Sequence, residues 1–308
     1  MKIIYLRNFK DCKMAIKNLS LVLGYFDGVH IGHSGLISFA QANSTQNALG
    51  VLTFDRALKS IEGCITNNTL KDKLFEELGV DYLFVMVCDD NLKSMSYITF
   101  VDKVLKALNP VKIFCGSDFH FGYERQGDVN YLKARFNQVY VLHYVTDHNG
   151  NKISSTNIKN EIKKGNVEEA DRWLGRPYII TGSIVHGLNN GDKIGFPTAN
   201  LTPDDNYIMP KNGVYITKIE VDGVKYKSIT NIGVHPTIEK LNKSIIETNV
   251  VGYEGNLYGK IVSLYFYKRL RDEKKFNSVD ELKKQITLDK AEAKHYFLYN
   301  KLKSDKTC

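Results

Sequence analysis

The sequence predicts an α/β domain with a parallel sheet, followed by a smaller β-rich domain that ends in a helix. Up to about residue 176, short apolar segments alternate with helical patterns, which is typical of a parallel sheet wrapped by helices. After Pro177, strand-like segments follow one another at short intervals, which indicates a small barrel or sandwich. A length of 308 residues also favours two cores over one. We therefore expect domains at residues 1–176 and 177–308.

The first domain is expected to contain strands and helices in turn. The expected strands are Leu21–Phe26, Gly50–Phe54, Asp81–Cys88, Val111–Cys115 and Val139–Val145. The expected helices are His33–Ala42, Leu70–Leu78, Tyr97–Leu108 and Val129–Phe136, and residues 154–175 form two more that are separated at Gly165. This order of elements favours a parallel sheet wrapped by helices.

The second domain is expected to be mostly antiparallel. The expected strands span residues 178–185, 213–221, 225–233, 244–253 and 259–267. An amphipathic helix over Ser278–Phe297 closes the chain. Ser278 is its expected N-cap, because Glu281 follows three residues later in the pattern of a capping box.

Composition fits an anionic partner, either a phosphate-bearing small molecule or nucleic acid, and a reducing compartment. Lys and Arg outnumber Asp and Glu by 42 to 34, giving a net charge of +8, but the lysines are spread along the chain. The five cysteines form no CxxC pair, which fits the cytoplasm. The longest apolar run, Tyr82–Cys88, is too short to span a bilayer, and the charged N-terminal segment does not resemble a signal peptide.

A glycine- and histidine-rich turn, "GYFDGVHIGH" (Gly24–His33), follows the first predicted strand. Gly24 permits a sharp turn, and Gly28 and Gly32 permit close approach of a phosphate to the N-terminus of the next helix. His30 and His33 can donate hydrogen bonds to the same phosphate chain. Two other interpretations stay open: a pair of structural histidines, or a metal site, which the absence of acidic or thiol groups at ligand spacing disfavours.

A second segment with the same character is "KISSTNIK" (Lys152–Lys159). Ser155 and Thr156 stand at the start of a predicted helix, and Lys159 follows one turn later. Hydroxyls, free backbone amides and a cation together favour a second anion site. An ordinary Ser/Thr helix cap is the alternative.

Together these segments resemble the two signatures of nucleotidyltransferases. Between them, "CGSDFHFGYERQGD" (115–128) is similar to the internal motif of the adenylyltransferase half of bacterial FAD synthetases. The β-rich half carries four segments that are similar, in order and spacing, to the riboflavin kinase module: "GLNNGDKIGFPTANL" (187–201), "NIGVHPT" (231–237), "ETNVVGYEGNLYGK" (247–260) and "LRDEKKFNSVDELKKQI" (270–286). The chain thus resembles the bacterial bifunctional riboflavin kinase/FAD synthetase family.

The resemblance implies a Rossmann-like nucleotidyltransferase domain followed by an antiparallel β-barrel riboflavin kinase domain with a C-terminal helix. It also implies two reactions. Riboflavin is phosphorylated by ATP to FMN, and FMN is adenylylated by a second ATP to FAD and pyrophosphate. The implied cofactor is Mg²⁺, with ATP as co-substrate, and we expect a cytoplasmic monomer or weak homo-oligomer with no nucleic-acid or membrane partner.

In the first domain the resemblance implies that His30 and His33 are catalytic. It assigns nucleotide or phosphate binding to Gly24, Phe26, Asp27, Gly28, Gly32, Asp118, Ser155, Thr156 and Lys159. Phe121 is the implied flavin contact there, with core packing as its alternative.

In the second domain the resemblance implies that Thr198 and Asn200, two apart on one strand, hold Mg²⁺ with hard oxygen ligands. Glu247 is the implied general base for the ribityl 5′-hydroxyl. ATP phosphates are assigned to Gly187, Gly191 and Lys193, and the flavin to Asn231 and Arg271.

Some positions depart from the family pattern, namely Arg56, Lys159 and Asp192. They leave open a protein with one of the two activities, or a non-catalytic regulator that binds flavin or nucleotide. A basic β-barrel in a chain with 18 tyrosines also leaves open a nucleic-acid-binding module, although Lys and Tyr do not interleave on one predicted strand.

Overall fold

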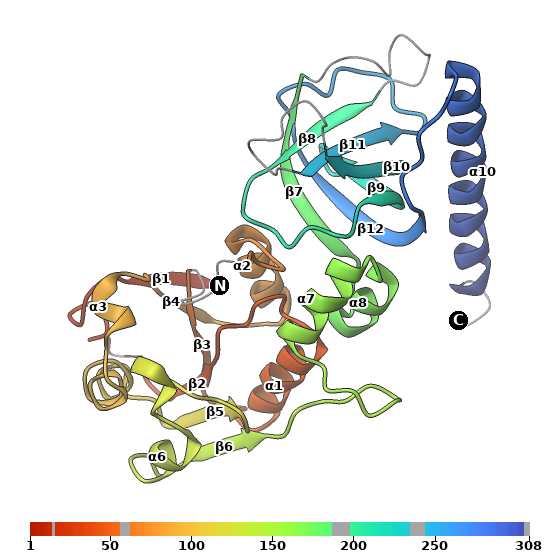
Figure 1. Cartoon of the computed structure of the whole chain (residues 1–308). Coiled ribbons are helices and arrows are strands. Elements are labelled where there is room, and N and C mark those ends of the chain that lie inside the picture. The colour runs from red at the N-terminus through yellow and green to blue at the C-terminus, as the bar shows by residue number, and fades with distance from the viewer. Residues whose placement is uncertain (14–15, 56–61, 187–197, 235–243, 305–308) are drawn as a thin grey trace. The chain divides into compact units, whose positions relative to one another are not determined.

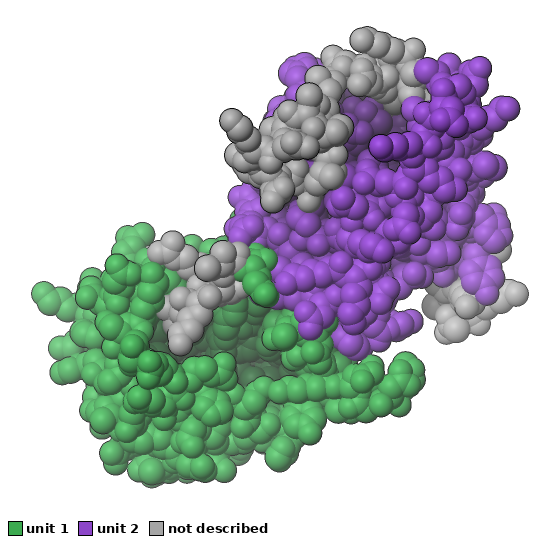
Figure 2. Space-filling view, in the orientation of Figure 1, with its two compact units in different colours: residues 1–157 green, residues 158–308 purple. Residues whose placement is uncertain are grey.

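The computed structural model describes residues 1–13, 16–55, 62–186, 198–234 and 244–304. Contacts within the chain divide it into two compact units, residues 1–157 and 158–308, coloured separately in Figure 2. Among the described helices, none combines the length and the apolar composition needed to cross a bilayer.

The first unit contains a six-stranded parallel sheet in the order β1-β4-β3-β2-β5-β6 (Figure 1). Its strands are β1 (Lys2–Leu6), β2 (Leu19–Leu23), β3 (Ala48–Phe54), β4 (Tyr82–Met86), β5 (Lys112–Gly116) and β6 (Val139–Leu142). The predicted α/β fold is confirmed. Strand β1 was not predicted; it lies at the edge of the sheet, where its side chains Ile3 and Tyr5 are exposed.

Helices cover both faces of this sheet. They are α1 (Ile31–Ala42), α2 (Asn68–Glu77), α3 (Asp90–Lys93), α4 (Tyr97–Phe100), α5 (Lys106–Leu108) and α6 (Val129–Lys133), with a π-helical turn at Val101–Leu105 and a 3₁₀ turn at Tyr123–Arg125. Val22 packs in one core cluster with Ile37 of α1 and Phe75 of α2. Its neighbour Leu21 packs in a second cluster with Phe100. Alternate residues of β2 therefore face opposite helical layers.

Strand β2 ends at Leu23, three residues before the predicted end at Phe26. Phe26 and Val29 have positive φ angles of 57° and 40°, which an extended strand does not allow. The segment after Leu23 is thus a tight loop, and it lies next to the point where the chain turns from β3 on one side of β2 to β5 on the other. Ligands bind at such a reversal of strand order in open α/β sheets.

The second unit contains a closed antiparallel barrel in the order β10-β11-β8-β7-β12-β9. Its strands are β7 (Tyr178–Val185), β8 (Ala199–Pro203), β9 (Gly213–Val221), β10 (Val224–Val234), β11 (Ser244–Val250) and β12 (Ile261–Arg271). The predicted barrel is confirmed. Before it, α7 (Ser155–Lys164) and α8 (Val167–Leu174) are separated at Gly165 as predicted, and α8 packs against β7 and β12.

Helix α10 (Val279–Ser304) covers one outer face of the barrel (Figure 1). Its Ala293 packs with Val214, Ile216 and Ile229. The predicted cap is present, because the backbone N–H of Glu281 donates to Ser278 Oγ at 3.2 Å and the Glu281 carboxylate accepts from the N–H of Asn277 at 3.0 Å. The described barrel thus contains the five expected strands in order, with β8 as a sixth, and the expected helix follows them.

Candidate functional site

The loop after β2 requires glycine at its first position. A Cβ added to Gly24 would lie 2.8 Å from Cζ of Phe26, closer than real carbon contacts allow. The Phe26 ring is buried and makes edge contacts with Phe75 of α2, at 5.5 Å between centroids, and with His33, at 5.0 Å. Packing of this ring therefore sets the course of the loop and turns it back towards the start of α1.

The two predicted histidines lie at the N-terminus of α1. The helix begins at Ile31, two residues before the predicted start, so that His30 is its N-cap. The rings of His30 and His33 stack at 3.6 Å between centroids. His30 Nδ1 accepts a hydrogen bond from the backbone N–H of His33 at 3.4 Å. Because Nδ1 is the acceptor, the proton of the neutral ring is on Nε2, which is then a donor.

The loop is also anchored to the segment that leads into α2. Asp27 Oδ1 accepts from the N–H of Ile65 at 2.8 Å, and the N–H of Gly28 donates to Thr66 Oγ1 at 3.2 Å. Gly28 has φ of 85°, a conformation that glycine adopts without strain. Gly32 stands in the first turn of α1, where a Cβ would lie 3.2 Å from the His30 ring. The predicted glycines thus shape the backbone around both histidines.

The two segments predicted to bind phosphate lie together. Ser155 Oγ donates to the carbonyl oxygen of Asp27 at 2.8 Å, across 128 positions of sequence. Ser154 Oγ accepts from the N–H of Asn157 at 3.3 Å and caps α7. Thr156 is exposed in the first turn of α7, and Lys159 lies one turn beyond Ser155 and is buried. Both the capping interpretation and the joined anion site are therefore compatible with this helix start.

Asp118 stands just after β5, the neighbour of β2. Its carboxylate accepts from Lys152 Nζ at 2.6 Å. Burial raises the pKa of Asp118, but the hydrogen bond and the charge of Lys152 outweigh this and hold the pKa below its ordinary value. Phe121 is 7% exposed and packs with Phe100 and Phe119 in the core. The alternative role of Phe121 in core packing is thus supported, and its contact with flavin stays a prediction.

In the barrel, the predicted kinase residues form one row across three strands. Glu247 of β11 is paired directly with Asn200 of β8 on one side and with Asn231 of β10 on the other. Side chains that are directly opposite in a sheet lie on the same face about 5 Å apart. The strand register thus gathers three residues separated by up to 47 positions, counted from Asn200 to Glu247. Thr198 lies one residue before β8, not within the strand as predicted, because β8 begins at Ala199.

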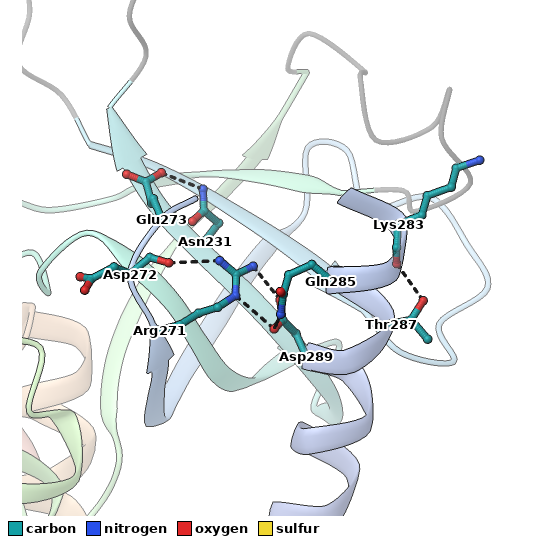
Figure 3. A network of polar contacts seen from close by, with 8 residues as sticks. All are labelled: Asn231, Arg271, Asp272, Glu273, Lys283, Gln285, Thr287 and Asp289. Carbon is teal, nitrogen blue, oxygen red and sulfur yellow. Dashed lines mark hydrogen bonds and ion pairs between the residues drawn. The ribbon is translucent and has the colours of Figure 1, made fainter. Parts of the chain in front are cut away.

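Arg271 continues this row at the end of β12, where it is paired with Val214. Figure 3 shows its guanidinium held by the buried Asp289 of α10, with Nε and Nη2 at 3.1 and 2.8 Å from the two carboxylate oxygens. Gln285 donates to the same carboxylate at 2.9 Å. Glu273, two residues beyond Arg271, accepts from Asn231 at 3.3 Å. The residues predicted to contact flavin thus belong to a polar network that joins the barrel to its helix.

Some of the predicted residues fall in segments that the structure does not describe. Gly187, Gly191 and Lys193, predicted to bind ATP phosphates, lie outside the described residues, as do Arg56 and Asp192. Among the residues that the structure does describe, no group of three or more His, Cys, Asp or Glu side chains could hold a metal ion. The oxygens of Thr198 and Asn200 are the hard, neutral ligands that Mg²⁺ accepts together with water and phosphate.

Sequence reasoning missed Lys71 of α2, which packs beside the loop after β2. It is 4% exposed, and its ammonium lies 4.9 Å from the centroid of the Tyr25 ring. The signal was present: Lys71 is spaced from Phe75 and Leu78 as one apolar helix face requires. A lysine on such a face is a buried cation, and in this chain it adjoins a predicted phosphate site.

Comparisons with known proteins match both halves of the chain to flavin enzymes. The family model for FAD synthetase matches residues 12–157, and the model for riboflavin kinase matches residues 174–297. A bifunctional riboflavin kinase/FMN adenylyltransferase of Bacillus subtilis is 36% identical over 90% of this chain and 92% of its own length. The enzyme of the same name from Listeria monocytogenes is 34% identical over 91% and 93%.

The fold and the matches over both units define a two-domain flavin-nucleotide transferase. The chain belongs to the bifunctional riboflavin kinase/FMN adenylyltransferase family. A crystal structure from Streptococcus pneumoniae, described as a macrolide-efflux protein, has the same fold over 96% of this chain and 99% of its own, with a TM-score of 0.87 and 32% identity. Both family models and the curated relatives name flavin enzymes instead.

Proposed function

We propose that this chain makes FAD from riboflavin in two steps, with one active site in each domain. Residues 177–308 transfer the γ-phosphoryl group of ATP to riboflavin, giving FMN and ADP. Residues 1–176 transfer the adenylyl group of a second ATP to FMN, giving FAD and pyrophosphate. The functional boundary at 176 keeps Ser155, Thr156 and Lys159 with the adenylyl site, although α8 packs on the barrel.

The adenylyl site is proposed around the loop Gly24–His33. The FMN phosphate attacks the α-phosphorus of ATP directly, so that the protein supplies alignment and charge stabilisation. His30 donates through Nε2, and His33 stacks on it in the first turn of α1, where a helix N-terminus favours an anion. The hydrogen bond from Ser155 to Asp27 is the observation that carries this proposal, since it joins the two signature segments.

Further contacts complete the proposed adenylyl site. Gly24, Phe26, Gly28 and Gly32 shape the backbone that receives the phosphates. Thr156 and Lys159 add a hydroxyl and a cation from α7, and Asp118 binds the nucleotide from the end of β5. Phe121 remains a proposed flavin contact, although it is 7% exposed.

The kinase site is proposed on the row Asn200–Glu247–Asn231. Glu247 accepts the proton of the riboflavin 5′-hydroxyl as that oxygen attacks the γ-phosphorus. Thr198 and Asn200 would hold Mg²⁺, which when bound neutralises charge on the ATP phosphates. The direct pairing of Asn200 with Glu247 carries this proposal, because it brings the metal ligand and the base within about 5 Å.

Flavin binding is proposed at the end of the same row. Asn231 supplies a polar contact, and Arg271 supplies a cation whose orientation Asp289 fixes (Figure 3). Gly187, Gly191 and Lys193 remain proposed ATP contacts. We further propose a cytoplasmic monomer or weak homo-oligomer that acts on these small molecules, without nucleic-acid or membrane partners. Light scattering during size-exclusion chromatography tests the oligomeric state.

One incubation tests the function. Purified protein is mixed with riboflavin, excess ATP and MgCl₂, and flavins are separated by chromatography with fluorescence detection; a parallel reaction starts from FMN. We expect riboflavin to become FMN and then FAD. FMN that accumulates without FAD indicates a chain with kinase activity alone, and adenylylation of FMN with untouched riboflavin indicates the reverse. Flavin binding without any turnover contradicts the proposal and supports a regulator.

A further inference from the structure

The described part of the first unit contains a buried cation at the carboxyl end of its sheet. Lys71 lies in the first turn of α2 and is 4% exposed. Its Nζ donates to the carbonyl oxygen of Phe54, the last residue of β3, at 3.1 Å. The same ammonium faces the ring of Tyr25 at 4.9 Å, and Tyr25 belongs to the loop Gly24–His33. The charge is thus placed beside the loop that we propose for phosphate binding.

The Lys71 ammonium has more donors than the described residues satisfy. An ammonium carries three N–H donors, and the Phe54 carbonyl is the one hydrogen-bond acceptor that Nζ reaches among the described residues. Within those residues the Lys71 ammonium also forms no ion pair. A buried cation with unsatisfied donors is strongly disfavoured unless a ligand or water completes it.

The surrounding carboxylates do not complete this cation. Asp27 and Asp55 are close enough to influence Lys71, but one oxygen of each already accepts from backbone, Asp27 from Ile65 and Asp55 from Cys88. Burial lowers the pKa of Lys71 below its ordinary value, and the charges of Asp27, Asp72, Cys64 and Asp55 offset this in part. These charges stabilise the ammonium without saturating its donors, so a further hydrogen-bond acceptor near Nζ would stabilise it more.

We propose that Lys71 is a phosphate-binding residue of the adenylyl site, which donates hydrogen bonds to a phosphate oxygen of ATP or of FMN. The proposal rests on the proposed phosphate site at Gly24–His33. Lys71 approaches this loop through Tyr25, while Thr53 Oγ1 donates to the Tyr25 carbonyl at 2.8 Å and ties the loop to β3. A phosphate oxygen there would accept hydrogen bonds from the remaining donors of Lys71.

The first test compares Lys71→Met with the matched control Lys73→Met in the full chain. Methionine keeps an unbranched apolar side chain and removes the ammonium. Lys73 is two residues along the same helix, exposed, and 4.0 Å from Glu77, so its replacement removes an equal charge at the surface. We expect Lys71→Met to raise a KM of FMN adenylylation at least tenfold and to weaken pyrophosphate binding in parallel. Lys73→Met is expected to match the wild type.

Separate KM values for ATP and for FMN identify which phosphate Lys71 binds. A raised KM for ATP identifies the triphosphate, and a raised KM for FMN identifies the flavin phosphate. Wild-type values for both KM and for pyrophosphate binding in Lys71→Met overturn the proposal. The riboflavin kinase rate of each variant reports concentration and folding of the second unit. A wild-type protein that makes no FAD from FMN refutes the adenylyl function itself, which is a different result.

A second measurement decides the case in which Lys71→Met fails to fold. The wild-type protein is labelled with ¹³C-lysine and the Lys71 Cε signal, assigned with Lys71→Arg, is followed over pH with and without pyrophosphate. We expect pyrophosphate to raise the pKa of Lys71, because the added anion stabilises the ammonium. A pKa of Lys71 that pyrophosphate leaves unchanged overturns the proposal, since a lysine that only caps Phe54 does not respond to this ligand.

Discussion

The two candidate sites obtain their geometry in different ways. The adenylyl site depends on the loop after β2. Residues of this loop have positive φ angles, the Phe26 ring packs inside it, and hydrogen bonds tie it to distant segments. The kinase row depends on strand register, which places Asn200, Glu247 and Asn231 side by side in a closed barrel. A barrel has no free edge and its register is hard to shift. Small changes of shape should therefore disturb the loop site, whereas the kinase row should respond mainly to a change of chemistry.

The largest effect is expected from Glu247→Gln, which removes the proposed base while keeping size and strand. The kcat of riboflavin phosphorylation should fall about 10²- to 10⁴-fold, and FAD formation from FMN should stay unchanged. Glu220→Gln is the control, because Glu220 is a barrel carboxylate bound to Lys225 and Tyr265 instead. Separate assays from riboflavin and from FMN measure both rates. A Glu247→Gln enzyme with a wild-type kinase rate refutes the assigned base.

The next largest effect is expected on the stability of the second unit, which should depend on pH. Burial raises the pKa of Asp171 from 3.8 to about 8, although the N–H of Tyr178 donates to its carboxylate at 2.7 Å. The folded state then binds more protons than the unfolded state between pH 4 and 8. Stability of this unit should be full near pH 4 and fall as pH rises to about 8, by up to about 1.4 kcal/mol per pH unit.

Asp171→Asn should remove this slope, because an amide keeps an acceptor for Tyr178 and has no charge to desolvate. Trp173, the single tryptophan of the chain, is buried two residues away and reports unfolding of this unit by fluorescence. Urea unfolding at several pH values gives the free energies. If the free energy of unfolding of Asp171→Asn depends on pH as steeply as that of the wild type, another group causes the dependence.

Gly24→Ala tests how far the loop site depends on shape. The added Cβ would overlap the Phe26 ring, so we expect a loss of about 1–3 kcal/mol in stability of the first unit and a fall in FAD formation of about tenfold or more. Gly35→Ala is the control, since a Cβ there has no atom within 4 Å and α1 gains helix propensity of about 0.5–1 kcal/mol. Kinase activity should be unchanged in both. Normal FAD formation by Gly24→Ala would contradict a shape-dependent site.

The difference between the two regions also explains what the sequence could predict. Strand and helix order follows from local patterns, and the break at Gly165 and the cap at Ser278 were predicted from a few residues each. The early end of β2 was not, because the left-handed Phe26 depends on where its ring packs. Likewise the role of His30 as N-cap depends on where α1 begins.

Contacts between segments that are distant in the sequence could not be predicted from local sequence patterns. The alternation in β11 predicts a strand but not that Glu247 is paired with Asn200 and Asn231, because register depends on the whole barrel. The resemblance to a family supplied those residues without their arrangement. Lys71 was within reach of pattern reasoning, since a charge on an apolar helix face is a recognisable conflict between local sequence and burial.

The smallest effect is expected from Ser155→Ala, which removes the hydrogen bond to the Asp27 carbonyl and leaves the loop otherwise intact. One neutral hydrogen bond contributes about 1 kcal/mol, so FAD formation should fall about fivefold with the kinase rate unchanged. Ser94→Ala is the control, because its hydroxyl also donates to a backbone carbonyl, that of Asp90 at 2.9 Å, but only four residues away. If both variants keep the wild-type rate of FAD formation, the long-range tie does not set the geometry of the loop. The geometry of the loop site would then depend on local packing around Phe26 alone. The loop site would differ less from the kinase row, whose geometry strand register sets, than the structure indicates.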